Sequence, residues 1–167
     1  FGGINLEDIS APRCFEIEER LKEMLNIPVF HDDQHGTAIV VLAGIINGLR
    51  VTGKKKEDCR VVVNGAGSAG VAITKLLITY GFRHVTMCDR EGIIGKDYPN
   101  LNWMQKKMTE VTNLENAKGT LADALKGADI FVGVSAPNIV TPEMVASMNK
   151  DSILFAMANP VPEIMPD

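Results

Sequence analysis

The sequence predicts an α/β protein built on a doubly wound parallel sheet, and three observations support this fold class. Short runs of β-branched residues alternate with segments of helical periodicity along most of the 167 residues. A glycine-rich turn joins one of these runs to a helix within residues 61–77. The next strand-like run ends at an acidic residue, Asp89. Parallel strands place their carboxyl ends on one rim, where the ligands of such sheets bind.

Composition places the chain among ordinary globular proteins. It is long enough for one domain with a hydrophobic core, and 46% of its residues are hydrophobic against 23% charged. The net charge of −4 lacks the basic footprint typical of proteins that bind nucleic acid or a membrane surface. Residues 37–49 form the longest apolar stretch, which is too short to cross a bilayer. We therefore expect neither nucleic acid nor a membrane as a partner.

The cysteines indicate a reducing compartment. Cys14, Cys59 and Cys88 are odd in number, widely spaced and set beside apolar residues. This pattern favours reduced core thiols and a cytoplasmic location, and it lacks the clustering of zinc ligands. The sequence starts at Phe1 without a methionine and stops just after a proline-rich turn. From these ends we expect a piece of a longer polypeptide.

The first third of the chain predicts two helices around one strand. Residues 11–25 carry apolar residues at helical spacing with charged residues between them, as in an amphipathic surface helix with Ser10 as its cap and Pro12 in its first turn. Residues 27–30 form a short strand. Residues 38–49 are apolar almost all round, which indicates a wholly buried helix.

The remaining two thirds alternate strands and helices. Residues 91–116 are polar and ambiguous, with a short helix at 101–111 that leaves Trp103 half buried. Thr141 is expected to cap a helix that has Pro142 at its first position. The other expected elements are strands at 61–63, 84–88, 128–134 and 152–158, and helices at 71–77, 121–125 and 141–148. Their order places residues 65–70, 89, 135–138 and 159 on one rim, so Ser135 and Asn159 join the cofactor-binding candidates.

The organising motif is Gly65-Ala66-Gly67-Ser68-Ala69-Gly70, which follows a valine run and precedes a helix. Gly65 permits the tight turn, Gly67 lets the backbone approach a pyrophosphate, and Gly70 lets the helix pack closely. Ser68 and Ala69 lie in the first helical turn, whose N–H groups and dipole face the anion. The alternative is a glycine turn that serves packing alone.

Asp89 strengthens the dinucleotide interpretation. It ends the second strand about 20 residues past the glycines, where the fingerprint places the carboxylate that binds the adenosine ribose. A carboxylate there repels a 2′-phosphate, so NAD is favoured over NADP. Arg90, the next residue, can instead pair with that phosphate, which keeps NADP as the alternative.

Two acidic pairs form a second constellation. Glu7-Asp8 lies in a glycine-bearing segment, and Asp32-Asp33 stands at a strand end. Several carboxylate oxygens are what Mg²⁺ or Mn²⁺ requires, and two such pairs can supply three ligands. Acidic pairs also occur as solvated loops or helix caps, which is the alternative. His31 and His35 flank the second pair and are interpreted either as residues that support the metal ligands or as structural, rather than as zinc ligands.

Four segments resemble the malic enzymes in their bacterial short form: residues 1–9, 30–38, 65–70 and Ala158-Asn159-Pro160. The resemblance covers essentially the whole chain. It implies a Rossmann-type NAD-binding domain over residues 1–167, in which residues 1–36 carry the metal ligands. By motif, it implies that Glu7, Asp8 and Asp33 bind the metal and that Asp32 neighbours the catalytic lysine. It also implies that Asn159 contacts the malate carboxylate or the nicotinamide.

The family resemblance implies oxidative decarboxylation of malate to pyruvate and CO₂, with NAD as hydride acceptor, Mn²⁺ or Mg²⁺, and a homodimer. In that family a tyrosine acid and a lysine base come from a preceding domain, and neither Tyr80 nor Tyr98 matches the tyrosine position. The chain alone is therefore expected to be inactive. The alternatives are a malolactic enzyme, which yields lactate, and a nucleotide-binding module without chemistry.

Overall fold

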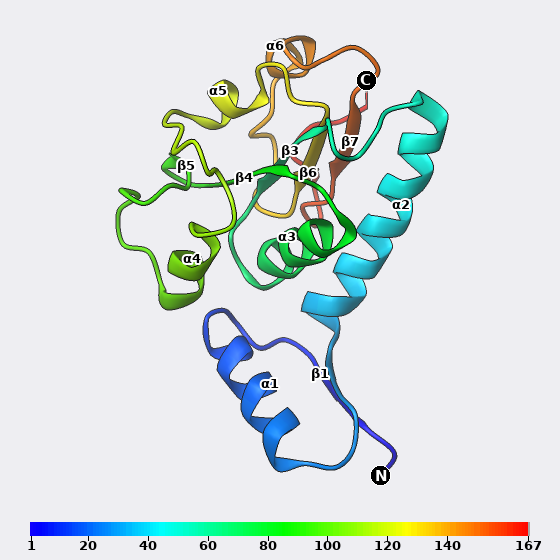
Figure 1. The fold of residues 1–167 in the computed structure, drawn as a ribbon, viewed down its shortest axis with the longest axis vertical. Coiled ribbons are helices and arrows are strands. Elements are labelled where there is room, and N and C mark those ends of the chain that lie inside the picture. Colours follow the sequence, from blue (N-terminus) through cyan, green and yellow to red (C-terminus); the bar gives the residue numbers. More distant parts are fainter. Residues whose placement is uncertain (167) are drawn as a thin grey trace.

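The computed structural model describes residues 1–166, and its elements follow the expected alternation of strands and helices (Figure 1). In chain order they are β1 (Ile4–Leu6), α1 (Arg13–Met24), β2 (Val29–His31), η1 (Asp32–Gly36), α2 (Thr37–Thr52), β3 (Arg60–Asn64), α3 (Ser68–Tyr80), β4 (His84–Asp89), β5 (Gly92–Ile93), α4 (Trp103–Met108), α5 (Leu121–Leu125), β6 (Ile130–Gly133), α6 (Pro142–Ala146) and β7 (Ile153–Ala156).

The main sheet has five strands in the order β5-β4-β3-β6-β7. β3, β4, β6 and β7 are parallel, whereas the two-residue β5 pairs antiparallel with β4. β3 and β6 lie inside the sheet and are buried on both faces, as expected of central parallel strands. The predicted parallel α/β fold is confirmed.

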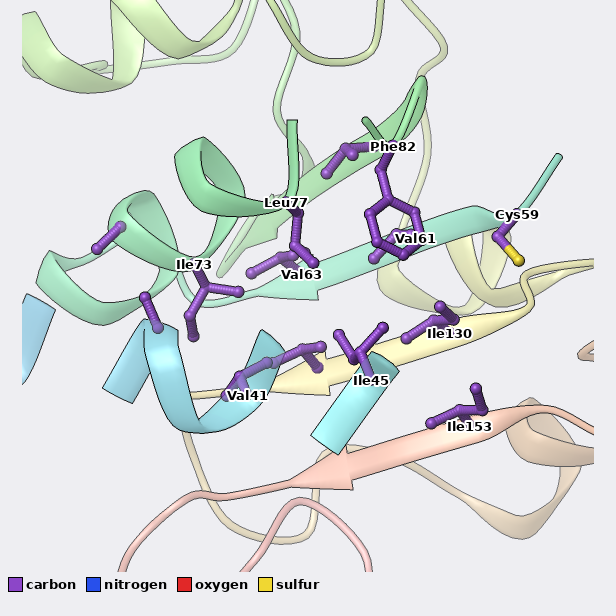
Figure 2. Packing of buried hydrophobic residues seen from close by; sticks show 14 residues of the cluster. Val41, Ile45, Cys59, Val61, Val63, Ile73, Leu77, Phe82, Ile130 and Ile153 are labelled. Carbon is purple, nitrogen blue, oxygen red and sulfur yellow. The ribbon is translucent and has the colours of Figure 1, made fainter. Parts of the chain in front are cut away.

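Helices cover both faces of this sheet, so it is doubly wound. On one face Val61 and Val63 of β3 pack against α2 and α3 through Ile45 and Leu77 (Figure 2). On the other face Val62 belongs to a separate cluster with residues of α5, β6 and α6. Successive residues of a strand point to opposite faces, so one valine run supplies both cores.

The N-terminal segment, drawn in blue in Figure 1, builds a second, smaller sheet. β1 and β2 are parallel, with Leu6 opposite His31, and α1 connects them. Cys14 and Phe15 of α1 pack against Val71 of α3 and residues of α4. This packing joins the N-terminal segment to the main domain.

Several local expectations need correction. α2 is not wholly buried, because Val41 and Ile45 face the core while Ile39 and Val40 are exposed. Ser10 does not cap α1 with its side chain, since its backbone carbonyl accepts the N–H of Cys14 instead. β1 and β5 were not expected from the sequence, and they are only three and two residues long. Strands this short carry too little alternation to be recognised.

The expected length of the apolar helix was also wrong. η1 and α2 form one continuous helix of 21 residues, Asp32–Thr52, which is long and apolar enough to cross a membrane by length and composition. The core helix of a soluble protein meets the same criterion. Here α2 lies close to β7: a Cβ added at Gly44 would come within 2.7 Å of the Phe155 ring. α2 therefore packs as a core helix along one side.

Candidate functional site

A cavity of about 1340 Å³ lies at the carboxyl edge of the main sheet. Gly65 and Gly67 after β3, Asp89 and Arg90 at the end of β4, and Ser135 after β6 line it. Tyr98 and Asn102 from the loop before α4, together with Gln105 of α4, line another side. The sheet therefore brings together, in one cavity, residues that the sequence separates by up to 70 positions, as expected of a doubly wound fold.

The three glycines have the expected steric roles. Gly65 has a φ of 112°, and a Cβ there would lie 2.6 Å from the carbonyl oxygen of Val134. A Cβ at Gly70 would overlap the carbonyl oxygen of Gly65 at 1.7 Å. Gly67 differs, because no described heavy atom lies within 4 Å of the position that a Cβ would take there. The turn is thus closed on its protein side and open above Gly67, where a phosphate needs to approach.

The open side of this turn is the start of a long helix. α3 begins at Ser68 and runs for 13 residues, so Ser68, Ala69 and Gly70 form its first turn. The N-cap residue Gly67 offers no side chain to these N–H groups. First-turn N–H groups lack intrahelical partners, and together with the helix dipole they favour an anion.

Asp89 is held in place by its neighbours. Its carboxylate accepts hydrogen bonds from the Arg90 backbone N–H at 2.9 Å and from Gln105 Nε2 at 3.3 Å. Gln105 Nε2 also lies 3.3 Å from the carbonyl oxygen of Ala66 in the glycine turn. The Arg90 side chain is exposed beside the same cavity. Asp89, which favours NAD, and Arg90, which can favour NADP, therefore both face this cavity.

Gln105 was not expected from the sequence, although a signal for it existed. Asn102 and Gln105 form a reciprocal capping box at the start of α4. The spacing Asn-x-x-Gln before a helix is a recognisable pattern of that kind. Its consequence was not visible in the sequence, since the contact with Asp89 depends on how α4 folds over β4.

Ser135 is fixed from two sides. Its hydroxyl accepts a hydrogen bond of 2.7 Å from Nδ2 of Asn64, which is buried at the end of β3. Its backbone N–H donates to Oε1 of Glu163 at 3.0 Å. Asn64 and Glu163 were not expected from the sequence. Asn159 is exposed beyond β7 and is not among the described residues that line the cavity.

The two acidic pairs leave neighbouring strands at the same end. Leu6 and His31 face each other across the β1–β2 pair, so Glu7-Asp8 and Asp32-Asp33 follow side by side. The backbone N–H of Asp8 donates to Oδ2 of Asp33 at 3.0 Å. Glu7 turns instead to Asn5, whose Nδ2 lies 2.7 Å from its carboxylate. The Asp32 side chain is exposed.

These acids do not fit a metal ion in their present arrangement. Among residues 1–166, no group of three His, Cys, Asp or Glu side chains is placed to hold one. The backbone thus assembles the two pairs, while the carboxylates of Glu7, Asp8 and Asp33 do not converge. We therefore assign no chemical step to a metal.

The two histidines beside the second acidic pair belong to one hydrogen-bond network. Gln34 Nε2 lies 2.8 Å from Nδ1 of His31 and 3.3 Å from Oε2 of the buried Glu18, and as a donor it serves both. Nε2 of His31 lies 3.4 Å from Asp33 Oδ2, without a hydrogen bond to any described residue. His35 binds the other oxygen of Glu18. This network anchors η1 to α1.

The cavity agrees with what the comparisons with known proteins show. Residues 34–165 match the family model described as the malic enzyme, NAD binding domain. The chain belongs to the malic enzyme family. It is 57% identical to an NAD-dependent malic enzyme of Geobacillus stearothermophilus, and it covers 35% of that relative. It is 56% identical to a bifunctional malic/malolactic enzyme of Bacillus subtilis, covering 41% of it.

Solved malic enzyme structures share the fold over nearly the whole chain. The NAD-dependent malic enzyme of Thermotoga maritima matches 99% of this chain with a TM-score of 0.96 and 52% identity, and 45% of that structure is covered. The malic enzyme of Pyrococcus horikoshii matches with a TM-score of 0.93, 44% identity and 41% covered. The chain therefore spans less than half the length of these relatives.

The family includes enzymes that use either cofactor. The malic enzyme of Escherichia coli, 49% identical over 99% of this chain and 22% covered, is named NADP-dependent. The identity of this chain to both kinds of enzyme establishes an NAD(P)-binding domain.

Proposed function

We propose that this chain is the nucleotide-binding part of an enzyme that converts malate to pyruvate and CO₂ with NAD as the oxidant. The observation that carries the proposal is the rim of the main sheet. There Asp89 and the open turn at Gly67, which directly precedes the N-terminus of α3, line one cavity. When bound, the dinucleotide supplies the hydride acceptor.

The chain's own residues have binding and orienting roles in this proposal. The first-turn N–H groups of α3 hold the pyrophosphate, and Gly67 leaves room for it. Asp89, steadied by Gln105, accepts the ribose hydroxyls of the adenosine half. Ser135 and Asn159 stand at the opposite half of the rim, where we place the nicotinamide and malate.

We further propose that Glu7, Asp8 and Asp33 bind Mn²⁺ or Mg²⁺ in the complete enzyme. The support is the family motif, together with the backbone contact between Asp8 and Asp33. Asp32, adjacent in η1, is proposed to face the catalytic lysine. A homodimer and a cytoplasmic location also stay predictions.

The test is a product assay with the full-length enzyme and malate. Formation of NADH and pyruvate in equal amounts would support the proposal, and NADP should serve less well than NAD. The relative that is named bifunctional malic/malolactic makes lactate the second candidate product. Lactate without net NADH would favour that reaction. The 167-residue chain alone should show no measurable malate turnover. The family's tyrosine acid and lysine base are not matched in it, and a placed acid–base group contributes about 10² to 10⁴ in rate.

A further inference from the structure

Glu163 is the most unusual buried group in the molecule. It follows β7 in the chain, its side chain is 0% exposed, and it forms no ion pair with any residue in the described range 1–166. Glutamates are almost never fully buried unless they are paired. A role in the structure or the site must therefore offset the desolvation of this carboxylate.

Two backbone N–H groups bind the Glu163 carboxylate, where a buried glutamate usually has a cationic side chain as its partner. Oε1 accepts the N–H of Ser135 and Oε2 accepts the N–H of Ala158, each at 3.0 Å. Ser135 follows β6 and Ala158 follows β7, so one carboxylate joins the segments that leave two neighbouring strands. Hydrogen bonds from N–H groups to a carboxylate are about twice as strong as neutral ones.

The main chain beside Glu163 strengthens the same junction. The carbonyl oxygen of Glu163 accepts the N–H of Val140, and that of Pro162 accepts the N–H of Asn138, each at 3.0 Å. The loop between β6 and α6 is thus bound to the segment after β7 through both side chain and backbone. These contacts fix the position of one loop relative to the other.

The chain leaves space for this carboxylate at Gly133, the last residue of β6. A Cβ added there would lie 2.3 Å from Cδ of Glu163. Any larger residue at this position would displace the carboxylate from its two N–H donors. The glycine and the buried glutamate therefore form one structural unit.

This unit continues to the centre of the sheet. Asn64, at the end of β3, donates to the hydroxyl of Ser135, whose backbone N–H donates to Glu163. The ends of β3, β6 and β7 are thereby linked by hydrogen bonds along the rim. Glycines after β3 take the pyrophosphate and Asp89 on β4 takes the adenosine ribose, so β6 and β7 flank the other half of a dinucleotide.

We propose that Glu163 is a positioning residue for the nicotinamide half of the cofactor. It holds Ser135, which lines the cavity, at a fixed spacing from the Ala158–Asn159 segment, and the nicotinamide ribose and ring bind beside Ser135. The inference deepens the proposed function and rests on it. A carboxylate is required because it offers two acceptor oxygens to two N–H donors, whereas a glutamine offers one acceptor and one amide donor.

The test compares the full-length enzyme with Glu163→Gln and Glu163→Asp. Calorimetry measures the Kd of NAD and of AMP, which carries only the adenosine half, and steady-state assays give KM for NAD and kcat. Glu163→Gln should raise the Kd and KM of NAD about tenfold or more, while the Kd of AMP changes less than about twofold. Glu163→Asp retains both acceptors on a shorter side chain and should show a smaller NAD loss of about threefold. Glu110 is an exposed residue after α4, so Glu110→Gln is the matched control and should change neither the Kd of NAD nor the Kd of AMP.

The ratio of the NAD and AMP dissociation constants is the deciding quantity, because partial unfolding lowers the active fraction without changing that ratio. If Glu163→Gln does not fold, the ratio in Glu163→Asp decides. Equal losses for NAD and AMP, or no loss for either, would overturn the positioning role. An unmodified enzyme that binds AMP but not NAD would overturn the proposed function as well.

Discussion

The carboxyl rim of the main sheet and the acidic N-terminal segment differ in how many hydrogen bonds hold their candidate binding side chains in place. At the rim, Asp89 is held by Gln105 and the Arg90 N–H, and Ser135 by Asn64 and Glu163. In the N-terminal segment the corresponding carboxylates are exposed or half exposed, and only Asp33 receives a backbone hydrogen bond from the other pair.

The difference follows from what each site is made of. A phosphate site uses backbone N–H groups and the space left by glycines, and both come with the fold itself. A site of several carboxylates brings like charges together, which is unfavourable until a cation or a neighbouring domain compensates them. The hydrogen bonds that fix the rim therefore form within one domain. In the acidic segment the backbone brings the two pairs together, but their carboxylates stay apart.

The largest expected effect is that of Gly70→Ala. Its Cβ would overlap the Gly65 carbonyl oxygen at 1.7 Å, and both partners are backbone, so α3 must move away from the turn. We expect a loss of stability of about 3 kcal/mol, measured by urea unfolding, with loss of NAD binding. Gly67→Ala is the matched control: its Cβ meets open space, so stability should hold while NAD binding weakens. Equal stabilities for the two variants would contradict the close packing at Gly70.

The second largest effect is expected for metal binding at the acidic N-terminal segment. Asp33→Asn should lower the Mn²⁺ affinity of the full-length enzyme by about 100-fold or more. Asp33 is proposed to bind the metal directly, and loss of a residue that only hydrogen-bonds to a metal ligand already costs about 10- to 100-fold. Free Mn²⁺ measured by electron paramagnetic resonance gives the affinity, and Glu16→Gln on α1 is the control. The 167-residue chain should bind Mn²⁺ at least tenfold more weakly. Equal affinity in chain and enzyme would show that the acidic segment is as complete as the rim.

The parts of the fold that could be predicted from the sequence are those with a local signal. The valine run at 61–63 is buried on both faces, and such a run is typical of a central parallel strand. Thr141 caps α6 through Met144 N–H with Pro142 at the first position, as its local pattern predicts. The glycine turn was also recognisable because the spacing of its three glycines between a strand and a helix is itself a local pattern.

The parts that could not be predicted depend on contacts between distant segments. α2 was expected to be wholly buried because its composition is apolar all round, but composition does not tell which face the sheet covers. Glu163 lies in a proline-rich turn that indicates only the end of an element, and its contact with Ser135 spans 28 residues. A buried carboxylate bound by backbone N–H groups leaves no pattern in the sequence.

A smaller effect is expected at the opposite edge of the sheet. Burial raises the pKa of Asp129, but hydrogen bonds from Lys54, the Arg60 N–H and Asn149 outweigh it and hold the pKa below its usual value. The carboxylate therefore stabilises the fold above its unfolded-state pKa of about 4, and this contribution is lost as the pH falls through the lower folded pKa.

Asp129→Asn should lower the unfolding free energy by about 2 kcal/mol at pH 7 and by less under acid, because the contribution of the ionised carboxylate is lost as the pH falls. Urea unfolding at pH 7 and pH 3 measures both values. The Kd of NAD for the folded protein should not change, because Asp129 precedes β6 and lies away from the cavity. A changed Kd would show that the rim depends on the far edge of the sheet.

The smallest and most specific effect concerns the choice of cofactor. Asp89→Ser removes the charge that repels a 2′-phosphate and an acceptor for the ribose hydroxyls, so the Kd of NAD should rise about tenfold while that of NADP falls. Arg90→Ala should leave NAD unchanged, because in this proposal Asp89 alone reads the ribose. In the Asp89→Ser background Arg90→Ala should reverse the gain for NADP, since the exposed guanidinium then pairs with the phosphate. Titration of both cofactors against the four proteins measures these effects. Equal or better binding of NADP by the unmodified enzyme would make Arg90 the deciding residue, and it would show that the rim holds Asp89 in place without using its charge for selection.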